Sequence, residues 1–253
     1  MNALTRSPPV PPEKAAVVGL WNVQWAAASN VKGKFFAPLL RDLDCDVLCI
    51  TEGSADILPA GGHIILCVAD CGYGVQGSRR KVMLWSRNPW QDVDEVGSVF
   101  LPPGRFVAGT TDTPLGLVRF NGVCIPWKDA HVSTGQRNRS PWQEHLTYCR
   151  HLAEACASSG ADTSVLLGDF NQRVPRQRQP AHVYSALINA LEGRFELATA
   201  GTIRGASGLT IDHLASTAGL RPAEVSYLSP ADGCGRAMSD HFGLRVSLMR
   251  ARS

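Results

Sequence analysis

The chain has 253 residues, 44% of them hydrophobic, which is enough to bury one large core. Its 25 basic and 22 acidic side chains give a net charge of +3, a balance that fits a polyanionic partner without requiring one. No apolar stretch is long enough to span a bilayer, and the first residues lack the charged-then-apolar order of a signal peptide. We therefore expect a cytoplasmic monomer with no membrane span.

The first residues of the chain differ in composition from the rest. Residues 1–14 are rich in proline and polar side chains, and we expect them to form a disordered lead-in. Residues 15–253 are expected to form a single domain. The valine and leucine content of residues 15–25 predicts that this domain begins with a strand.

The next two elements are a helix and a strand that ends in a carboxylate. Apolar residues at helical spacing predict a helix over residues 34–43, and Pro38 predicts that the helix starts near it. Residues 46–52 are a short apolar run that closes with Glu52, which indicates a buried strand. A carboxylate at that place is costly to bury unless a cation neutralises it, and a metal ion would do so.

Strands follow one another through the middle of the chain. Residues 63–69, 81–86, 105–111 and 115–126 are rich in β-branched and aromatic side chains, which favours strands. Asn121-Gly122 predicts a two-residue hairpin turn that divides the last of these runs. With the helix predicted above and another over residues 141–159, starting at a Ser140-Pro141 cap, the pattern indicates two packed sheets covered by helices.

Residues 165–171 carry the most informative stretch. An apolar run ends at Gly168, followed by Asp169, Phe170 and Asn171, as in a buried strand that opens into a loop where α/β folds place their chemistry. Because side chains alternate along a strand, Asp169 and Asn171 should point the same way and Phe170 into the core. The carboxylate can bind a hard cation or orient a water, and the amide can contact a phosphoryl oxygen. Local backbone capping by both side chains is the alternative.

The last third of the chain adds two more acidic motifs. A helix is predicted over residues 180–191, and strands over residues 223–228 and 244–248. Asp212 lies in a short apolar run between them, and Asp240-His241 precedes the final strand. Adjacent Asp and His can orient an imidazole or share a metal. No glycine-rich phosphate loop is present, so nucleotide-driven chemistry is not expected.

The eight cysteines show no C-x-x-C spacing, and most lie in or beside apolar runs. We expect reduced, buried thiols. The i,i+4 pairs Cys45/Cys49 and Cys67/Cys71 leave a metal cluster open as an alternative.

Five motifs, in their order, resemble the endonuclease/exonuclease/phosphatase superfamily, which includes deoxyribonuclease I and exonuclease III. They span about 220 residues and are Trp21-Asn22-Val23, residues 46–52, Gly168-Asp169-Phe170-Asn171, Ile211-Asp212-His213 and Ser239-Asp240-His241. The resemblance implies an α/β (α+β) fold, a four-layer αββα sandwich of two packed, mainly antiparallel sheets flanked by helices. It also implies a divalent metal, Mg²⁺ or Mn²⁺, and hydrolysis of a phosphoester.

The resemblance implies a metal site built from three residues. Glu52 resembles the metal-binding glutamate of the family. Asn22 resembles the asparagine that helps to hold the metal or the phosphate, and Asp240 is expected to be a metal ligand or the support of a histidine. Thr51 stands where many members have glutamine. This difference changes the residue next to the metal ligand Glu52 and leaves Glu52 itself intact.

The resemblance also implies the catalytic groups. Asp169 resembles the aspartate that orients or deprotonates the attacking water, and Asn171 resembles its partner on the scissile phosphate. His241 resembles the histidine beside the phosphate, acting as base or electrostatic stabiliser. Asp212 resembles the carboxylate that orients a histidine or the leaving-group side of the site. His131 is the candidate for the family's His or Tyr after a middle strand, although the preceding Trp127-Lys128-Asp129 departs from the usual pattern.

The substrate class is the least determined property of the sequence. Arg79, Arg137 and Arg173 belong to short basic clusters that could line a phosphate groove, and Trp127 could stack on a base. We therefore favour a nuclease that hydrolyses phosphodiester bonds in DNA or RNA by in-line attack of an activated water. The alternatives are a phosphodiesterase or phosphatase acting on a lipid or inositol phosphate, a non-catalytic binding module on the same fold, and a zinc-cluster regulator.

Overall fold

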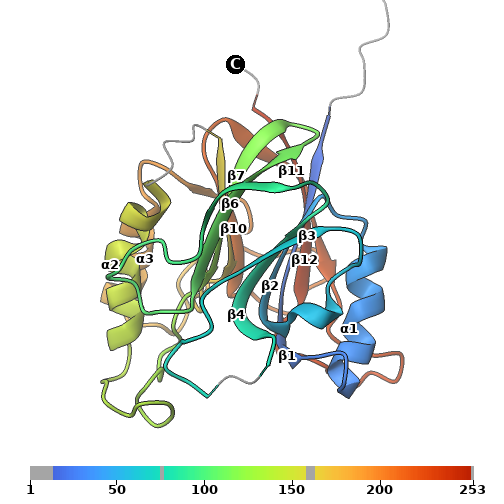
Figure 1. Cartoon of the computed structure of the whole chain (residues 1–253). Helices are drawn as coiled ribbons and strands as arrows, with labels where there is room; N and C mark the ends of the chain where they lie inside the picture. The colour runs from blue at the N-terminus through green and yellow to red at the C-terminus, as the bar shows by residue number, and fades with distance from the viewer. Residues whose placement is uncertain (1–13, 75–76, 158–162, 252–253) are drawn as a thin grey trace, which may run out of the picture.

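The computed structural model describes residues 14–74, 77–157 and 163–251, in which two six-stranded sheets pack face to face (Figure 1). The first sheet has the order β11-β12-β1-β2-β4-β3. Its strands are β1 (Ala16–Ala26), β2 (Val47–Ser54), β3 (His63–Leu66), β4 (Arg79–Ser86), β11 (Leu220–Leu228) and β12 (Gly243–Arg250). The second sheet has the order β5-β6-β7-β8-β10-β9. Its strands are β5 (Trp90–Asp94), β6 (Phe106–Thr113), β7 (Gly116–Cys124), β8 (Ser164–Asp169), β9 (Glu196–Leu197) and β10 (Asp212–Ser216).

Helices cover the outer face of each sheet, so that the molecule has four layers (Figure 1). The helices are α1 (Val31–Asp42), α2 (Gln143–Ala157), α3 (Ala181–Leu191) and the single 3₁₀ turn η1 (Ala55–Ile57). Helix α1 lies on one side of the sandwich, and α2 and α3 lie together on the other. The four-layer αββα sandwich predicted from the sequence is confirmed.

Three apolar layers hold the four structural layers together, and alternation along the strands produces them. Leu20 of β1 and Leu167 of β8 belong to the core between the sheets. Phe36 of α1 packs in the core on the outer side of the first sheet, and Tyr148 of α2 in that of the second. Phe36 and Tyr148 are fully buried. Burial of each such side chain contributes about 1.5–3 kcal/mol, so each helix is fixed mainly by its apolar face.

The strand directions bring the polar ends of several strands together. Each sheet has one parallel pair, β1–β2 or β7–β8, among antiparallel neighbours. The carboxyl ends of β1, β2, β7 and β8 therefore lie at the same end of the sandwich as the amino ends of β4, β10 and β12. The register places Asp212 directly opposite Asp169. It also pairs Thr51 with Val82 and Gly53 with Arg80, so that Glu52 and Lys81 are neighbours.

Helix α1 begins earlier than predicted. Its N-cap is Asn30, whose side-chain Oδ1 accepts a hydrogen bond from the Gly33 amide (2.9 Å), and Pro38 lies inside the helix. The expectation that the helix starts near Pro38 is therefore wrong. Pro38 is exposed, so its ring faces solvent, and the cap satisfies an amide at the true start.

Asn121-Gly122 does not form the predicted hairpin turn. Both residues lie inside β7, and the turn between β6 and β7 is at Pro114-Leu115, next to the Thr113–Gly116 pair. Asn121 is fully buried, and its Nδ2 donates to Ser164 Oγ (2.8 Å) and Val165 O (3.1 Å). The amide thus fastens β7 to β8. Gly122 lies where an added Cβ would be 3.0 Å from a Val82 methyl, so it permits close contact between the sheets.

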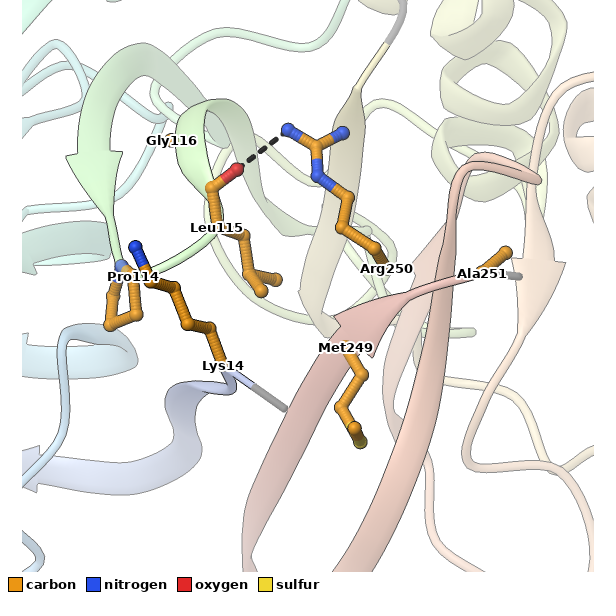
Figure 2. A pocket seen from close by; sticks show the side chains of 7 residues that line it. All are labelled: Lys14, Pro114, Leu115, Gly116, Met249, Arg250 and Ala251. Atoms are coloured by element: carbon orange, nitrogen blue, oxygen red, sulfur yellow. Dashed lines mark hydrogen bonds between the residues drawn. The ribbon is translucent and has the colours of Figure 1, made fainter. Parts of the chain in front are cut away.

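A hollow of about 500 Å³ lies at the end of the sandwich opposite to Asp169 and Asp212. Lys14, Leu115 and Met249 line it, and Arg250 Nη2 donates to Leu115 O (2.6 Å), which ties the end of β12 to the β6–β7 turn (Figure 2). None of the described residues that line this hollow has a carboxylate or imidazole. The acidic residues that the sequence singled out lie at the other end of the sandwich, where β1, β2, β7 and β8 end.

Three further expectations concern the cysteines, the first residues of the chain and membrane-spanning helices. All eight cysteines, which fall in the described ranges, are free thiols, and seven are buried. Of the residues expected to be a disordered lead-in, all but Lys14 lie outside the described part of the chain. No helix within the described ranges has the length and apolar character needed to cross a membrane.

Candidate active site

Polar side chains from both sheets line a cleft of about 270 Å³ at the end where the strand termini meet. The lining residues are Asn22, Gln24, Glu52, Lys81, Arg105, Cys124, Trp127, Asp169, Asn171, Ile211, Asp240 and His241. Among them are seven of the side chains that the sequence singled out. Asp212 lies directly beneath and contacts His241. Side chains up to 219 residues apart in the sequence, Asn22 to His241, thus share one cleft.

Asp169, at the end of β8, is the buried carboxylate of this cleft. Its Oδ2 accepts a hydrogen bond from Asn22 Nδ2 (3.0 Å), and its Oδ1 accepts one from the Asn171 amide (2.9 Å). Burial raises the pKa of Asp169 to about 7, and the neighbouring Asp212 charge acts in the same direction. A carboxylate whose pKa lies near neutrality can take a proton from water at physiological pH.

Asn171 is held in a conformation that few residues adopt. Its φ of +54° lies in the left-handed region, where asparagine is tolerated better than most residues. Its Nδ2 donates to Ile125 O (2.8 Å) just beyond the end of β7. Phe170 is fully buried in the outer core next to α2 and α3, as the alternation along the strand predicted. The loop after β8 therefore directs Asp169 and Asn171 to the cleft.

His241 and Asp212 form a hydrogen-bonded pair. His241 Nδ1 donates to Asp212 Oδ2 at 2.6 Å. Burial alone would lower the pKa of His241, but the charge and hydrogen bond of Asp212 outweigh it and raise this pKa to about 10. His241 is therefore an imidazolium at neutral pH, a cation placed among carboxylates.

The loop that carries His241 is fastened to β1. Trp21 Nε1 donates to His241 O (3.0 Å), and Ser239 Oγ donates to Asn22 O (2.8 Å). The His241 amide in turn donates to Ser239 Oγ (3.1 Å). These bonds fix the imidazole relative to Asn22, so this part of the cleft is pre-organised.

Glu52 lies near the end of β2, opposite a cation from its own sheet. Lys81 Nζ lies 2.6 Å from Glu52 Oε1, and the Lys81 side chain is 8% exposed. Glu52 has a φ of +50°, a strained value that turns its carboxylate into the cleft. The sequence predicted a cation at this carboxylate, and the structure supplies Lys81 at one of its two oxygens.

The donor set of the cleft fits a hard divalent ion. Glu52, Asp169 and Asp240 offer carboxylate oxygens, and Asn22 offers an amide oxygen. Asp240 Oδ1 accepts a hydrogen bond from Gln24 Nε2 (2.8 Å), which orients that carboxylate. Asp169, Asp212 and His241 also cluster within 4.8 Å. However, His241 Nδ1 donates to Asp212, so these two residues act as a hydrogen-bonded pair and do not both ligate through those atoms.

Arg105 belongs to the cleft and was not found from the sequence. Its side chain is buried, and the residue is 2% exposed. Nη1 donates to Cys124 O (3.3 Å), while Nη2 has no hydrogen-bond partner among the described residues. The sequence does contain a signal for it, because Arg105 directly precedes the apolar run Phe106-Val107-Ala108, just as Glu52 closes another apolar run. A buried guanidinium with an open donor is suited to binding an anion.

The structure does not bring all candidate residues into the cleft. His131 is buried beside it, where its Nδ1 accepts a hydrogen bond from the Gln136 amide (3.1 Å) and its ring stacks on Tyr73. Burial lowers the pKa of His131. Cys124, the last residue of β7, is the side chain that the middle strand contributes to the cleft. Arg137 and Arg173 are exposed and lie outside the lining set.

A family model described as the Endonuclease/Exonuclease/phosphatase family matches residues 19–241. The chain belongs to this family. The match begins just before Asn22 and ends on His241, so it contains every residue of the cleft. The family resemblance drawn from the sequence motifs is confirmed.

Solved structures with the same fold include several members of the endonuclease/exonuclease/phosphatase family. An AP endonuclease from Archaeoglobus fulgidus is 16% identical, with a TM-score of 0.65 over 91% of this chain and 98% of that one. The 3′ phosphatase NExo from Neisseria, bound to product DNA hairpin, is 22% identical, with a TM-score of 0.62 over 92% and 98%. D. rerio TDP2 with single strand DNA product is 11% identical, with a TM-score of 0.61 over 92% and 98%. No curated protein matches the sequence.

Proposed function

We propose that the chain is a divalent-metal-dependent phosphoesterase, and that its substrate is a phosphodiester bond of DNA or RNA. The observation that carries this proposal is the convergence of Asn22, Glu52, Asp169, Asp240 and His241 on one cleft. DNA is named as a ligand of two of the structural neighbours, which supports a nucleic acid as the substrate class.

The proposed chemistry follows from the protonation states of two residues. Asp169 takes a proton from the attacking water, whose oxygen forms the new bond to phosphorus as the bond to the leaving oxygen breaks. The His241 imidazolium, held by Asp212, faces the negative charge that develops on the phosphoryl oxygens. Asn22 and Asn171 orient Asp169, which needs no rearrangement when the substrate arrives.

Glu52, Asp240 and Asn22 would hold Mg²⁺ or Mn²⁺, which when bound neutralises charge on the phosphoryl group. Lys81 already contributes a positive charge next to Glu52. Arg105 adds a second positive charge on the same cleft. The binding of a polyanion is thus supported by residues of the chain itself.

The test is hydrolysis of plasmid DNA, single-stranded DNA, RNA, sphingomyelin and inositol phosphates with Mg²⁺ or Mn²⁺, with and without EDTA. Asp169→Asn removes the proton acceptor and keeps the shape, so we expect it to lose activity by roughly 10²-fold or more. The matched control is Asp42→Asn, because Asp42 makes its ion pair on the exposed face of α1. Full activity in Asp169→Asn, or equal loss in the control, contradicts the proposed role.

The same panel separates the other candidate functions. Cleavage of sphingomyelin or an inositol phosphate, with nucleic acids untouched, places the substrate among lipid or inositol phosphates. Binding of oligonucleotides by a folded protein that hydrolyses nothing indicates a binding module on this fold.

A further inference from the structure

A second pocket of about 610 Å³ adjoins the catalytic cleft. It shares Glu52, Lys81 and Trp127 with the cleft, so that the two are continuous. The remaining described residues that line it are Trp25, Tyr73, Gly74, Arg79 and Thr134. A pocket of this size lies within the range of small-ligand sites.

Three aromatic rings and two cationic side chains, Arg79 and Lys81, line this pocket. Trp127 is 43% exposed although it is a large aromatic residue, and Trp25 and Tyr73 are half-buried. Lys81 Nζ lies 4.7 Å from the Trp25 ring centroid and 5.3 Å from that of Tyr73. An ammonium ion placed between aromatic rings next to a catalytic cleft combines a stacking surface with a phosphate-binding charge.

Contacts restrain the Tyr73 ring and the Trp25 backbone before any ligand binds. His131 stacks on Tyr73 with ring centroids 4.4 Å apart, and the His131 amide donates to Tyr73 Oη (2.9 Å). Trp25 has a φ of +63°, and its carbonyl accepts a hydrogen bond from Asn30 Nδ2 (3.2 Å). His131, which does not reach the cleft, thus has a role here as the support of Tyr73. Fixed rings lower the entropy cost of stacking.

We propose that this pocket binds one unpaired base of a nucleic-acid substrate, from the nucleotide next to the scissile phosphate. The inference rests on the proposed function and extends it to single strands or frayed ends. A base in a duplex has both faces covered by its neighbours and cannot enter a walled pocket without unstacking. Arg79 and Lys81 then lie beside the phosphate of that nucleotide, and Arg105 lines the cleft that takes the scissile one.

The test compares two oligomers with the same backbone charge, a twelve-residue oligothymidylate and a twelve-residue chain of abasic tetrahydrofuran phosphates. Kd is measured by fluorescence anisotropy with labelled oligomers and the Asp169→Asn protein, so that the result does not depend on turnover. We expect tighter binding of the oligothymidylate by roughly 5- to 100-fold, the range for stacking of one base. On the wild type, kcat/KM should show a preference in the same direction.

Two variants test whether the preference for oligothymidylate over the abasic oligomer arises in this pocket. Trp127→Ala and Tyr73→Leu should each bring the ratio of the two Kd values toward one, while Trp127→Phe should retain most of it. The matched control is Phe100→Ala, because Phe100 is 60% exposed and stacks on His151, away from both pockets. Circular dichroism establishes that each variant is folded.

The outcomes separate this inference from the proposed function. Equal Kd values for the two oligomers in the parent protein overturn the base subsite, even if both oligomers are hydrolysed. A preference that persists in Trp127→Ala and Tyr73→Leu places the base elsewhere and also overturns it. Lack of hydrolysis with a preference that depends on Trp127 leaves the subsite standing and refutes the phosphoesterase.

Discussion

The contact between Asp212 and His241 decides the charge of the imidazole at the centre of the cleft. Burial lowers the pKa of His241, and Asp212, with smaller contributions from Asp169 and Asp240, raises it by more. The Asp212 Oδ1 atom is buried and has no partner among the described residues, so the interaction with His241 is made through Oδ2 alone. Removing the charge at residue 212 takes away the two largest contributions that raise the pKa of His241 and leaves burial as the largest single influence on it.

We predict that Asp212→Asn shifts the pKa of His241 downward, to or below its ordinary value near 6.5. In the wild type the imidazolium persists until the pH approaches about 10. In the variant it is lost as pH rises through the neutral range, so kcat/KM of the variant, divided by that of the wild type at the same pH, should fall between about pH 6 and pH 8. An NMR titration of the His241 ring protons measures the pKa directly. An unchanged midpoint would show that Asp212 does not hold the proton on His241.

The residue-level features of the site were predictable only where a polar side chain interrupts an apolar run. Glu52 and Asp169 stand out because each closes an apolar run of the sequence, Glu52 within β2 and Asp169 at the end of β8. Lys81 and Arg105 each open one, but a basic residue at a strand start is common on a solvated edge. Their burial depends on the facing sheet, which lies far away in the sequence. His131 was selected for its residue type, and the packing of Tyr73 determines where its ring lies.

At the scale of the element, the close approach of β7 and β8 depends on Gly168. This residue has a φ of +132° and pairs with Val123 across the parallel strands. A Cβ at position 168 would lie 2.1 Å from Val123 O, which is a backbone atom and cannot move aside alone. The glycine thus permits the turn of chain that directs Asp169 into the cleft.

We predict that Gly168→Ala lowers the free energy of unfolding by at least roughly 2 kcal/mol, because it adds both backbone strain and a clash. Gly233→Ala is the control, since a Cβ there meets nothing within 4 Å. Its effect should be within about 1 kcal/mol. Urea denaturation curves for the two variants provide the comparison. A Gly168→Ala protein as stable as the control would show that the strands can separate to accept the methyl group.

Elements were predictable from the sequence to the extent that local signals agree with tertiary packing. The apolar strands and the helix α3 follow their own periodicity, and α3 begins within one residue of the prediction. The Asn121-Gly122 signal failed because the Asn121 amide pairs with β8, a partner 43 residues away. Pro38 misled because a proline on the exposed side of a helix is tolerated once Asn30 has capped the true start.

At the scale of the whole molecule, two buried histidines join α2, the loop after β8 and β10. His145 Nδ1 donates to Pro126 O (2.7 Å), and its Nε2 accepts a hydrogen bond from Gln172 Nε2 (2.7 Å). His213 Nε2 donates to Gln172 O (2.9 Å). Burial lowers the pKa of each histidine to about 4. Both are therefore neutral in the folded protein at physiological pH.

We predict that these two histidines destabilise the fold in acid. In the unfolded chain they take up protons below about pH 6.5, whereas the folded chain resists until about pH 4. The stability they confer is complete above pH 6.5 and is lost as pH falls through this window, on the order of 3 kcal/mol for each. Asp169, whose pKa is raised to about 7, has the opposite effect on stability, because its protonation as pH falls through this range favours the folded state.

A difference measurement isolates the contribution of His145 from that of Asp169. The gap in unfolding free energy between wild type and His145→Gln should narrow steadily from pH 6.5 to pH 4. His63→Gln is the control, because His63 is exposed on β3. A gap that stays constant over this range would show that His145 does not titrate differently in the folded and unfolded states.

The strand order of the two sheets bears on how the proposed activity depends on the packing of one sheet against the other. Each sheet has the same sequence of pairings, with its single parallel pair third of five, so the sandwich has an approximate internal two-fold arrangement. The cleft lies between the halves: Asn22, Glu52 and His241 come from one, and Asp169 and Asp212 from the other. Neither half contains a complete site. The proposed activity therefore depends on the docking of the two sheets, and we expect an opened state with both sheets intact to be inactive.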